Sequence, residues 1–151
     1  MRRKDREITD RAEIEAILNE AMVCRIGLAN GGEPYVVPLS FGYEDGAVYI
    51  HSAPEGKKIG MIAKNSRCCF EVDVCDRVIR GDSPCSWGMR YRSVIGYGRA
   101  AILTAPEEKK HGLNCIMRHY GGGTHDLSES DIGSVTVIRI AVESMTGKKH
   151  D

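Results

Sequence analysis

The segment from Tyr49 to Asn65 carries the side chains best suited to chemistry. It reads Y-I-H-S-A-P-E-G-K-K-I-G-M-I-A-K-N: the polar pair His51 and Ser52 ends a strand, and a turn leads to Lys57 and Lys58 at the start of an amphipathic helix. Free backbone N–H groups and the positive end of the helix dipole converge at a helix N-terminus. The segment therefore predicts a site for a phosphate group; the alternative is that the two lysines form a solvated first turn.

Composition limits the classes of partner. Of the 151 residues, 42% are hydrophobic and 28% charged, which is typical of one soluble globular domain spanning residues 1–151. The 21 basic and 21 acidic residues cancel, so no net charge attracts nucleic acid or a membrane. The charged start M-R-R-K-D-R-E leads into no apolar run, so we expect no signal peptide and a cytoplasmic location. Small molecules and other protein subunits are the expected partners.

Six cysteines raise the question of a disulfide framework or a metal site. The adjacent Cys68 and Cys69 point to opposite faces of a strand, and the chain has no C-x-x-C pair. His125 and Asp126 are metal-ligand types in a polar loop, and we expect them to face solvent. We therefore predict reduced thiols and no metal site. The cysteines are Cys24, Cys68, Cys69, Cys75, Cys85 and Cys115.

A helix over residues 10–21 is the first element that the sequence predicts. Asp10 can cap its N-terminus, and Glu13 at the third helical position completes a capping box. The apolar residues recur at i, i+3, i+4 and i+7, which indicates one buried stripe for packing. They are Ile14, Ile17, Leu18 and Ala21.

Three strands are expected next, and the second contains Pro38. Because proline cannot donate a ladder hydrogen bond, this position belongs to an edge or a bulge. The backbone of Pro38, Leu39 and Ser40 is thus a candidate ligand-facing segment, although an ordinary edge strand accounts for the proline equally well. The strands are expected over residues 24–29, 35–43 and 47–51.

Residues 75–89 mix glycine and proline with apolar side chains and are predicted to form a loop that packs on another surface. This loop follows the short helix over residues 57–64 and a strand over 67–74. It holds Trp87, the one tryptophan of the chain. A tryptophan in a loop stacks on a cofactor, fills a subunit interface or fills a core.

The remaining chain completes the predicted barrel. Gly96 and Gly98 interrupt a long strand over residues 92–103 and indicate the bend of a closed or half-closed barrel. Thr104 and Glu107 then form a capping box for a second amphipathic helix. A last strand over 135–142 precedes a tail that we expect to fray. About six strands with two or three outer helices predict a mainly β, mostly antiparallel barrel with helical additions.

Three motifs in this order and spacing resemble a known family. They are P-L-S-F-G-Y with its Asp-Gly hairpin, Y-I-H-S-A-P-E-G-K-K with its helix, and W-G-M-R-Y-R-S-V-I-G-Y-G-R-A. Together they are similar to the flavin-binding split-barrel proteins related to pyridoxamine 5'-phosphate oxidase, and within them to the nitroimidazole-resistance branch. The likeness runs from about residue 6 to residue 148.

The resemblance implies a homodimer of six-stranded antiparallel split β-barrels with FMN in two clefts at the subunit interface. Lys57 and Lys58 would hold the phosphate, and Trp87 would approach the ring from the same or the partner chain. Lys57 stands where the oxidase branch has an arginine, and a lysine is a point charge without the bidentate grip of arginine. Oxidation of pyridoxamine phosphate is therefore not expected. The other cofactor-binding positions implied are Pro38, Leu39, Ser40, His51, Ser52, Ser93 and Val94, with Ser93 replacing a glutamine of that branch.

The function that the resemblance implies is that of an FMN-dependent oxidoreductase. A reduced nicotinamide nucleotide is the expected donor, and a nitro compound or quinone is the expected acceptor. His51 is the one residue near the cleft able to shuttle a proton near neutral pH, unless it is a satisfied structural histidine. The alternative is a flavin-binding module without turnover, for storage or sensing; similar barrels also bind haem or a deazaflavin.

Overall fold

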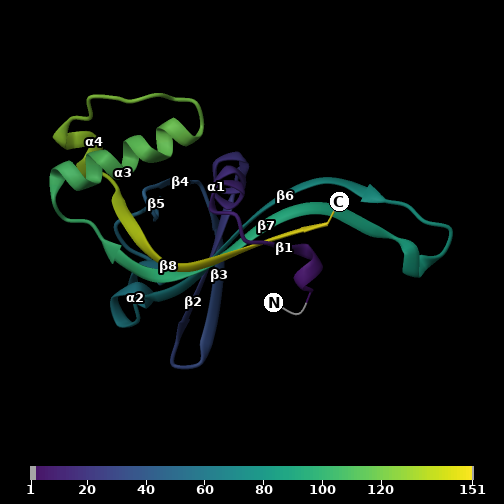
Figure 1. Ribbon diagram of the computed structural model, residues 1–151. Helices are drawn as coiled ribbons and strands as arrows, with labels where there is room; N and C mark the ends of the chain where they lie inside the picture. The colour runs from purple at the N-terminus through teal and green to yellow at the C-terminus, as the bar shows by residue number, and fades with distance from the viewer. Residues whose placement is uncertain (1–2, 151) are drawn as a thin grey trace.

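The computed structural model describes residues 3–150, in which eight antiparallel strands form one continuous sheet (Figure 1). The strand order is β3-β2-β6-β7-β8-β5-β4, and the short β1 pairs with β8. The fold is thus mainly β and antiparallel as predicted, with eight strands where six were expected. The strands are β1 Glu7–Ile8, β2 Cys24–Asn30, β3 Glu33–Leu39, β4 Phe41–Glu44, β5 Ala47–Ser52, β6 Arg67–Ile79, β7 Gly88–Ile102 and β8 Thr136–His150.

The two edge strands of this sheet are neighbours in the sequence. β3 and β4 lie at opposite ends of the strand order, yet only Ser40 separates them along the chain. The sheet must therefore curl until its two edges meet at Ser40, which makes a barrel with a split between β3 and β4. The single strand predicted over residues 35–43 is wrong for this reason: it is two strands on opposite edges.

The barrel interior is filled by alternate residues of the curled strands. Phe41, Phe70, Val72 and Val94 are fully buried there. Gly96 on β7 faces the Phe70 ring so closely that an added Cβ would lie 2.1 Å from it. The ladder between β7 and β8 also shifts register between Tyr97 and Gly98. This bulge and the missing side chains let the sheet bend, as the two glycines predicted.

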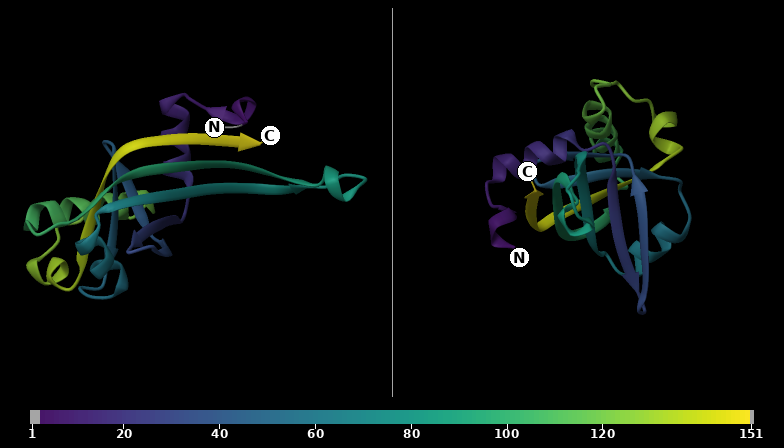
Figure 2. Two further views of the ribbon diagram at one scale, coloured as in Figure 1. Left: turned by 90° about the horizontal axis from the view of Figure 1, so that it is seen from below. Right: turned by 90° about the vertical axis from the view of Figure 1, so that its right-hand side faces the viewer.

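β6 and β7 extend beyond the barrel as a long two-stranded arm (Figure 2). Their pairing continues to Ile79 and Gly88, and the 3-10 turn Pro84–Ser86 closes the tip. The loop predicted over residues 75–89 is therefore wrong. Both faces of the arm are largely exposed, so the sequence there has no alternation of apolar and polar residues to mark a strand.

The frayed tail expected after residue 142 is also part of the sheet. β8 continues to His150 and pairs with β7 as far as Tyr91. Tertiary contacts keep this half of β8 extended, because β7 pairs with it on one side and β1 on the other. Gly147 is buried against Ile8 and Ile14.

The helices cover the outside of the barrel. Asp10 caps α1 through the backbone N–H of Ala12, as predicted, whereas Glu13 accepts a hydrogen bond from Lys149. The side chain of Thr104 does not cap α3, which starts after Ala105. The helices are α1 Arg11–Glu20, α2 Lys57–Lys64, α3 Pro106–His119 and α4 Glu129–Gly133, with 3-10 turns at Lys4–Arg6 and Pro84–Ser86.

The last turn of α3 spans the split in the barrel. The backbone N–H of Phe41, at the start of β4, donates to the Tyr120 hydroxyl at 3.1 Å. That hydroxyl donates in turn to the Met22 carbonyl at 2.8 Å. Tyr120 thus satisfies one backbone group on each side of the opening.

All six cysteines are free thiols, and Cys24, Cys68 and Cys115 are buried. Burial raises the pKa of Cys24 to about 12 and that of Cys68 and Cys115 to about 11. Within residues 3–150 no group of three or more His, Cys, Asp or Glu side chains could hold a metal ion. No helix of that part of the chain is both long and apolar enough to cross a membrane.

Candidate functional site

The segment from β5 to α2 forms the strand-turn-helix unit that the sequence predicted. His51 and Ser52 end β5, where they pair with Val137 and Thr136 of β8. Gly56, with φ of 134°, precedes the helix in a conformation that favours glycine. No side chain within the described residues caps α2, so the N–H groups of its first turn stay available to an anion.

Lys57 and Lys58 have different environments although they are adjacent. The Lys57 ammonium lies 2.6 Å from the Glu33 carboxylate and 5.2 Å from the centre of the Tyr35 ring. Glu33 of the β2–β3 hairpin therefore supplies this lysine with a counter-charge. Lys57 and Glu33 lie beside a hollow of about 250 Å³, which α2 and the β2–β3 hairpin line together.

Lys58 is half-buried and has no hydrogen bond or ion pair within residues 3–150. Burial lowers the pKa of its ammonium. A partly desolvated cation without a counter-charge is stabilised by an added anion. Of the two lysines, Lys58 is therefore the better phosphate ligand.

Pro38 lies in the edge strand β3, opposite Arg25 of β2. Its side chain is exposed, Leu39 is half-buried against the core, and Ser40 is exposed at the split. Glu33, which contacts Lys57, begins the same strand, so six residues of β3, or roughly 20 Å of strand, separate Lys57 from Ser40. A ligand that contacts both ends must be elongated.

Ser93 and Val94 lie on opposite faces of β7. The Ser93 side chain is half-buried on the outer face, between Asp73 of β6 and Lys148 of β8. Val94 is fully buried in the barrel core. Its side chain therefore faces away from any outer cleft, and a ligand can reach this position only through the backbone.

Trp87 follows the turn Pro84–Ser86 in the chain. The tip of the arm that this turn closes lies far from α2 (Figure 1). The 13 residues of β6 separate the two, a length along the strand of roughly 40 Å. Trp87 is 53% exposed, and its indole N–H donates to the Gly81 carbonyl at 2.9 Å. The structure therefore does not bring Trp87 to the Lys57–Lys58 cleft of its own chain.

A family model described as pyridoxamine 5'-phosphate oxidase matches residues 10–149. The chain belongs to this family. The split barrel that the sequence predicted is the architecture shared by its solved relatives. No curated protein sequence matches the chain.

Solved structures of the oxidase family and its relatives align over most of this chain. A proposed 5-nitroimidazole antibiotic resistance protein from Bacteroides thetaiotaomicron is 37% identical with a TM-score of 0.84, covering 94% of this chain and 85% of its own. An FAD-binding protein from Mesorhizobium loti is 27% identical with a TM-score of 0.71, covering 97% and 98%. The flavocytochrome Anf3 from Azotobacter vinelandii is 21% identical with a TM-score of 0.87, covering 100% and 72%.

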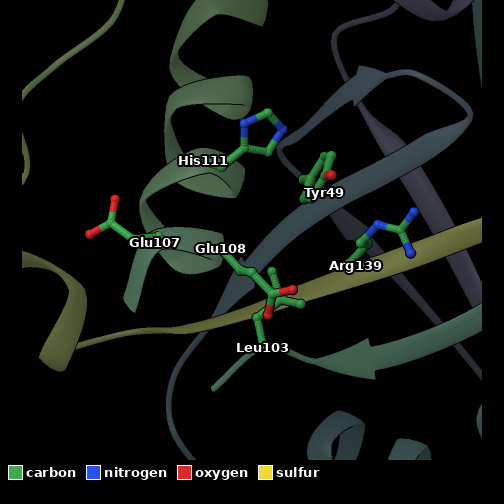
Figure 3. Close-up of a pocket in the computed structure, with 6 residues that line it drawn as sticks. All are labelled: Tyr49, Leu103, Glu107, Glu108, His111 and Arg139. Atoms are coloured by element: carbon green, nitrogen blue, oxygen red, sulfur yellow. The ribbon is translucent and has the colours of Figure 1, made fainter. Parts of the chain in front are cut away.

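A further pocket, which the motifs did not indicate, lies between α3, β5 and β8 (Figure 3). Its volume is about 320 Å³. Arg139 was the sequence signal that could have indicated this pocket, because it is a charged residue inside the apolar run V-T-V-I-R-I-A-V. The pocket is lined by Tyr49, Leu103, Glu107, Glu108, His111 and Arg139.

Proposed function

We propose that the protein is an FMN-dependent oxidoreductase that passes electrons from a reduced nicotinamide nucleotide to a small acceptor of the nitro-compound or quinone type. The observation that carries this proposal is the half-buried Lys58 ammonium, which has no counter-charge within residues 3–150 and lies in the uncapped first turn of α2. Family membership supports a flavin as the anion-bearing group. The 37% identity to the proposed nitroimidazole resistance protein supports the class of acceptor.

The residues of the site fit an elongated phosphate ester. Lys58 and the first N–H groups of α2 would hold the phosphate, with Ser52 of the same chain adding a hydroxyl. Ser52 pairs with Thr136 and Ser93 with Lys148, at opposite ends of β8, so we propose that the Ser93 hydroxyl comes from the partner chain. The backbone of Pro38, Leu39 and Ser40 would lie along the ring. FMN, when bound, supplies the redox chemistry, and the protein supplies binding and orientation.

His51 is the residue of this segment suited to proton transfer. Its side chain is exposed at the end of β5, one residue before Ser52. An imidazole changes charge near neutral pH, so it can hold a proton for an acceptor that takes up electrons. We place the reaction in the cytoplasm, because six free thiols suit a reducing compartment.

The active unit is proposed to be a homodimer. Val36 and Tyr97 are exposed apolar side chains in one row across the outer face of the sheet, connected through Gly27 and Cys69. Exposed apolar strips of this kind favour association. We propose that the second copy docks on this face with its arm, and with it Trp87, directed at the cleft of the first copy.

A flavin-binding module without turnover is the second candidate. No carboxylate or cysteine lies in the strand-turn-helix segment beside the phosphate site except the exposed Glu55. One structural relative is named an FAD-binding protein and another a flavocytochrome. Such a module would carry flavin, haem or a deazaflavin for storage or sensing.

Purified protein distinguishes these candidates. The enzyme is expected to be yellow after reconstitution with FMN, to lose flavin absorbance when a reduced nicotinamide nucleotide is added, and to regain it with a nitro compound or quinone. Flavin binding without any response to donors and acceptors would establish the module. A Soret band with no flavin uptake would rule out both flavin functions.

A further inference from the structure

The pocket under α3 is separate from the strand-turn-helix segment and has its own arrangement of charges. Tyr49 of β5 and Leu103 form its apolar surface, and the helix and β8 supply charged side chains on two sides (Figure 3). Gly112 lets α3 approach closely, because an added Cβ would lie 3.0 Å from the Tyr49 ring. The pocket is thus built between fixed elements.

Arg139 brings a positive charge to this pocket from the middle of the sheet. It pairs with Tyr49 of β5 and Ala101 of β7 in the strand ladders, and its side chain is half-buried. Within residues 3–150 its guanidinium has no hydrogen bond or ion pair. A half-buried guanidinium in a pocket is suited to gripping a carboxylate with two parallel hydrogen bonds.

Glu108 brings a negative charge to the same pocket from α3. It too has no ion pair or hydrogen bond within the described residues, and it does not reach Arg139. The other acidic neighbours are occupied: the Glu107 carboxylate contacts Lys110 at 3.4 Å and is directed away from Arg139 (Figure 3), and Glu44 contacts His111 at 2.8 Å. The pocket therefore presents one available charge of each sign on opposite sides.

We propose that this pocket binds a small zwitterion with an apolar body, of the α-amino acid class. Arg139 takes the carboxylate, and Glu108 accepts a hydrogen bond from the ammonium. Tyr49 and Leu103 cover the apolar side chain, while His111, held against Glu44 and edge-on to the Tyr49 ring at 5.4 Å, closes the upper side. The volume of about 320 Å³ suits a ligand of this size.

Three probes that share one apolar body test the charge pattern. L-leucine carries both charges, 4-methylpentanoate only the carboxylate, and 3-methylbutylamine only the ammonium. Titration of the full-length protein, followed by calorimetry and by ligand-detected NMR, is expected to give the tightest binding for L-leucine, with each single-charge probe at least about tenfold weaker. No binding of L-leucine, or equal binding of either single-charge probe, would overturn the proposal.

Paired variants locate the binding. Arg139→Gln and Glu108→Gln are each expected to weaken L-leucine binding at least about tenfold. Glu107→Gln is the matched control, because the carboxylate of this adjacent glutamate contacts Lys110 and is directed away from Arg139, and it should bind as the parent does. Circular dichroism checks that each variant is folded. If Arg139→Gln does not fold, Glu108→Gln alone tests the proposal, because Glu108 is exposed. Unchanged binding in Glu108→Gln, or equal loss in Glu107→Gln, contradicts the assignment. These measurements do not depend on FMN binding, so they test the pocket under α3 independently of the proposed flavin function.

Discussion

The Lys57 ammonium lies 2.6 Å from the Glu33 carboxylate, so the first of two adjacent lysines has a counter-charge that stands 24 residues earlier in the chain. Lys58, next to it, is half-buried and has no such partner within the described residues. The two lysines should therefore differ in their importance for FMN binding. Lys58→Met is expected to weaken FMN binding by about 1–2 kcal/mol, the lower range for a charge-assisted contact because the ammonium is partly solvated.

Lys57→Met is the matched comparison for this effect and should weaken FMN binding less. Fluorescence titration of FMN against each variant measures the two dissociation constants. Lys64→Met, in the last turn of α2, controls for the loss of a nearby exposed charge. A larger loss in Lys57→Met than in Lys58→Met would mean that the phosphate displaces Glu33 from Lys57.

Trp87 and Lys58 should contribute to one cleft from two different chains. Separately, Trp87→Ala and Lys58→Met homodimers should each have impaired flavin sites. In a mixed dimer, one cleft regains both Lys58 and Trp87, while the other loses both. Mixing the two variants is therefore expected to restore flavin binding of parental affinity in about half of the clefts of the heterodimers.

The measurement is a fluorescence titration of tagged and purified heterodimers, with each homodimer as control. If both residues served a cleft of the same chain, neither cleft of a heterodimer would be intact. Flavin binding in the mixture would then equal the average of the two homodimers. A monomeric protein in solution would contradict the dimer itself.

The Tyr120 hydroxyl is expected to stabilise the split side of the barrel. Tyr120→Phe leaves the Phe41 N–H and the Met22 carbonyl without this partner, at a cost of about 1–3 kcal/mol in the free energy of unfolding. For a domain of this size, that corresponds to about 2–4 °C in Tm per kcal/mol. Thermal and urea unfolding followed by circular dichroism measure the change.

Tyr35→Phe is the control for Tyr120, because the Tyr35 hydroxyl has no hydrogen bond within the described residues. Its free energy of unfolding should change by no more than about 0.5 kcal/mol. Equal stability of the two variants would show that water replaces the Tyr120 hydroxyl at the split without loss.

The buried thiols predict a dependence of reactivity and stability on pH. Burial raises the pKa of Cys24 to about 12 and that of Cys115 to about 11, so neither forms a thiolate in the folded protein near pH 9. In the unfolded chain these thiols ionise near their ordinary pKa of 9.0. The free energy of unfolding should therefore fall as the pH rises from about 9 toward the raised values, since the unfolded state alone loses protons there.

An aromatic disulfide reagent measures the reactivity at pH 8 and pH 9. The exposed Cys85 should react first, and the exposed Cys75 more slowly, because its hydrogen bond to Asp73 raises the pKa of that thiol. Cys85→Ser should remove the faster of these two reactions. Cys24, Cys68 and Cys115 should react only when denaturant is added. Rapid modification of all six thiols in the native protein would mean that the barrel opens easily.

The elements that periodicity describes could be predicted from the sequence, and those that tertiary contacts define could not. Helix 57–64 has an apolar face and a preceding glycine, and the structure places α2 at the same residues. The arm beyond Val74 is exposed on both faces, so its strands show no alternation. The break at Ser40 separates two strands that look continuous in sequence, because only the curled sheet places them on opposite edges.

The candidate site divides in the same way. The position of Lys57 and Lys58 at a helix start follows from local sequence. The neutralisation of Lys57 by Glu33, and the distance between Trp87 and that cleft, depend on how distant strands pair. The burial of Val94 on the face opposite Ser93 follows from simple alternation along β7 and was available from the sequence.

The position of β8 in the sheet has a consequence for biosynthesis. β8 lies between β7 and β5, so the strands made before it form two ribbons, β3-β2-β6-β7 and β5-β4, with no ladder between them. A ribosome must therefore release residues 136–150 before the barrel can close, and the nascent chain exposes unpaired strand edges until then. Translation speed and chaperone supply should accordingly govern the yield of this protein more strongly than that of a fold whose neighbouring strands are consecutive in sequence.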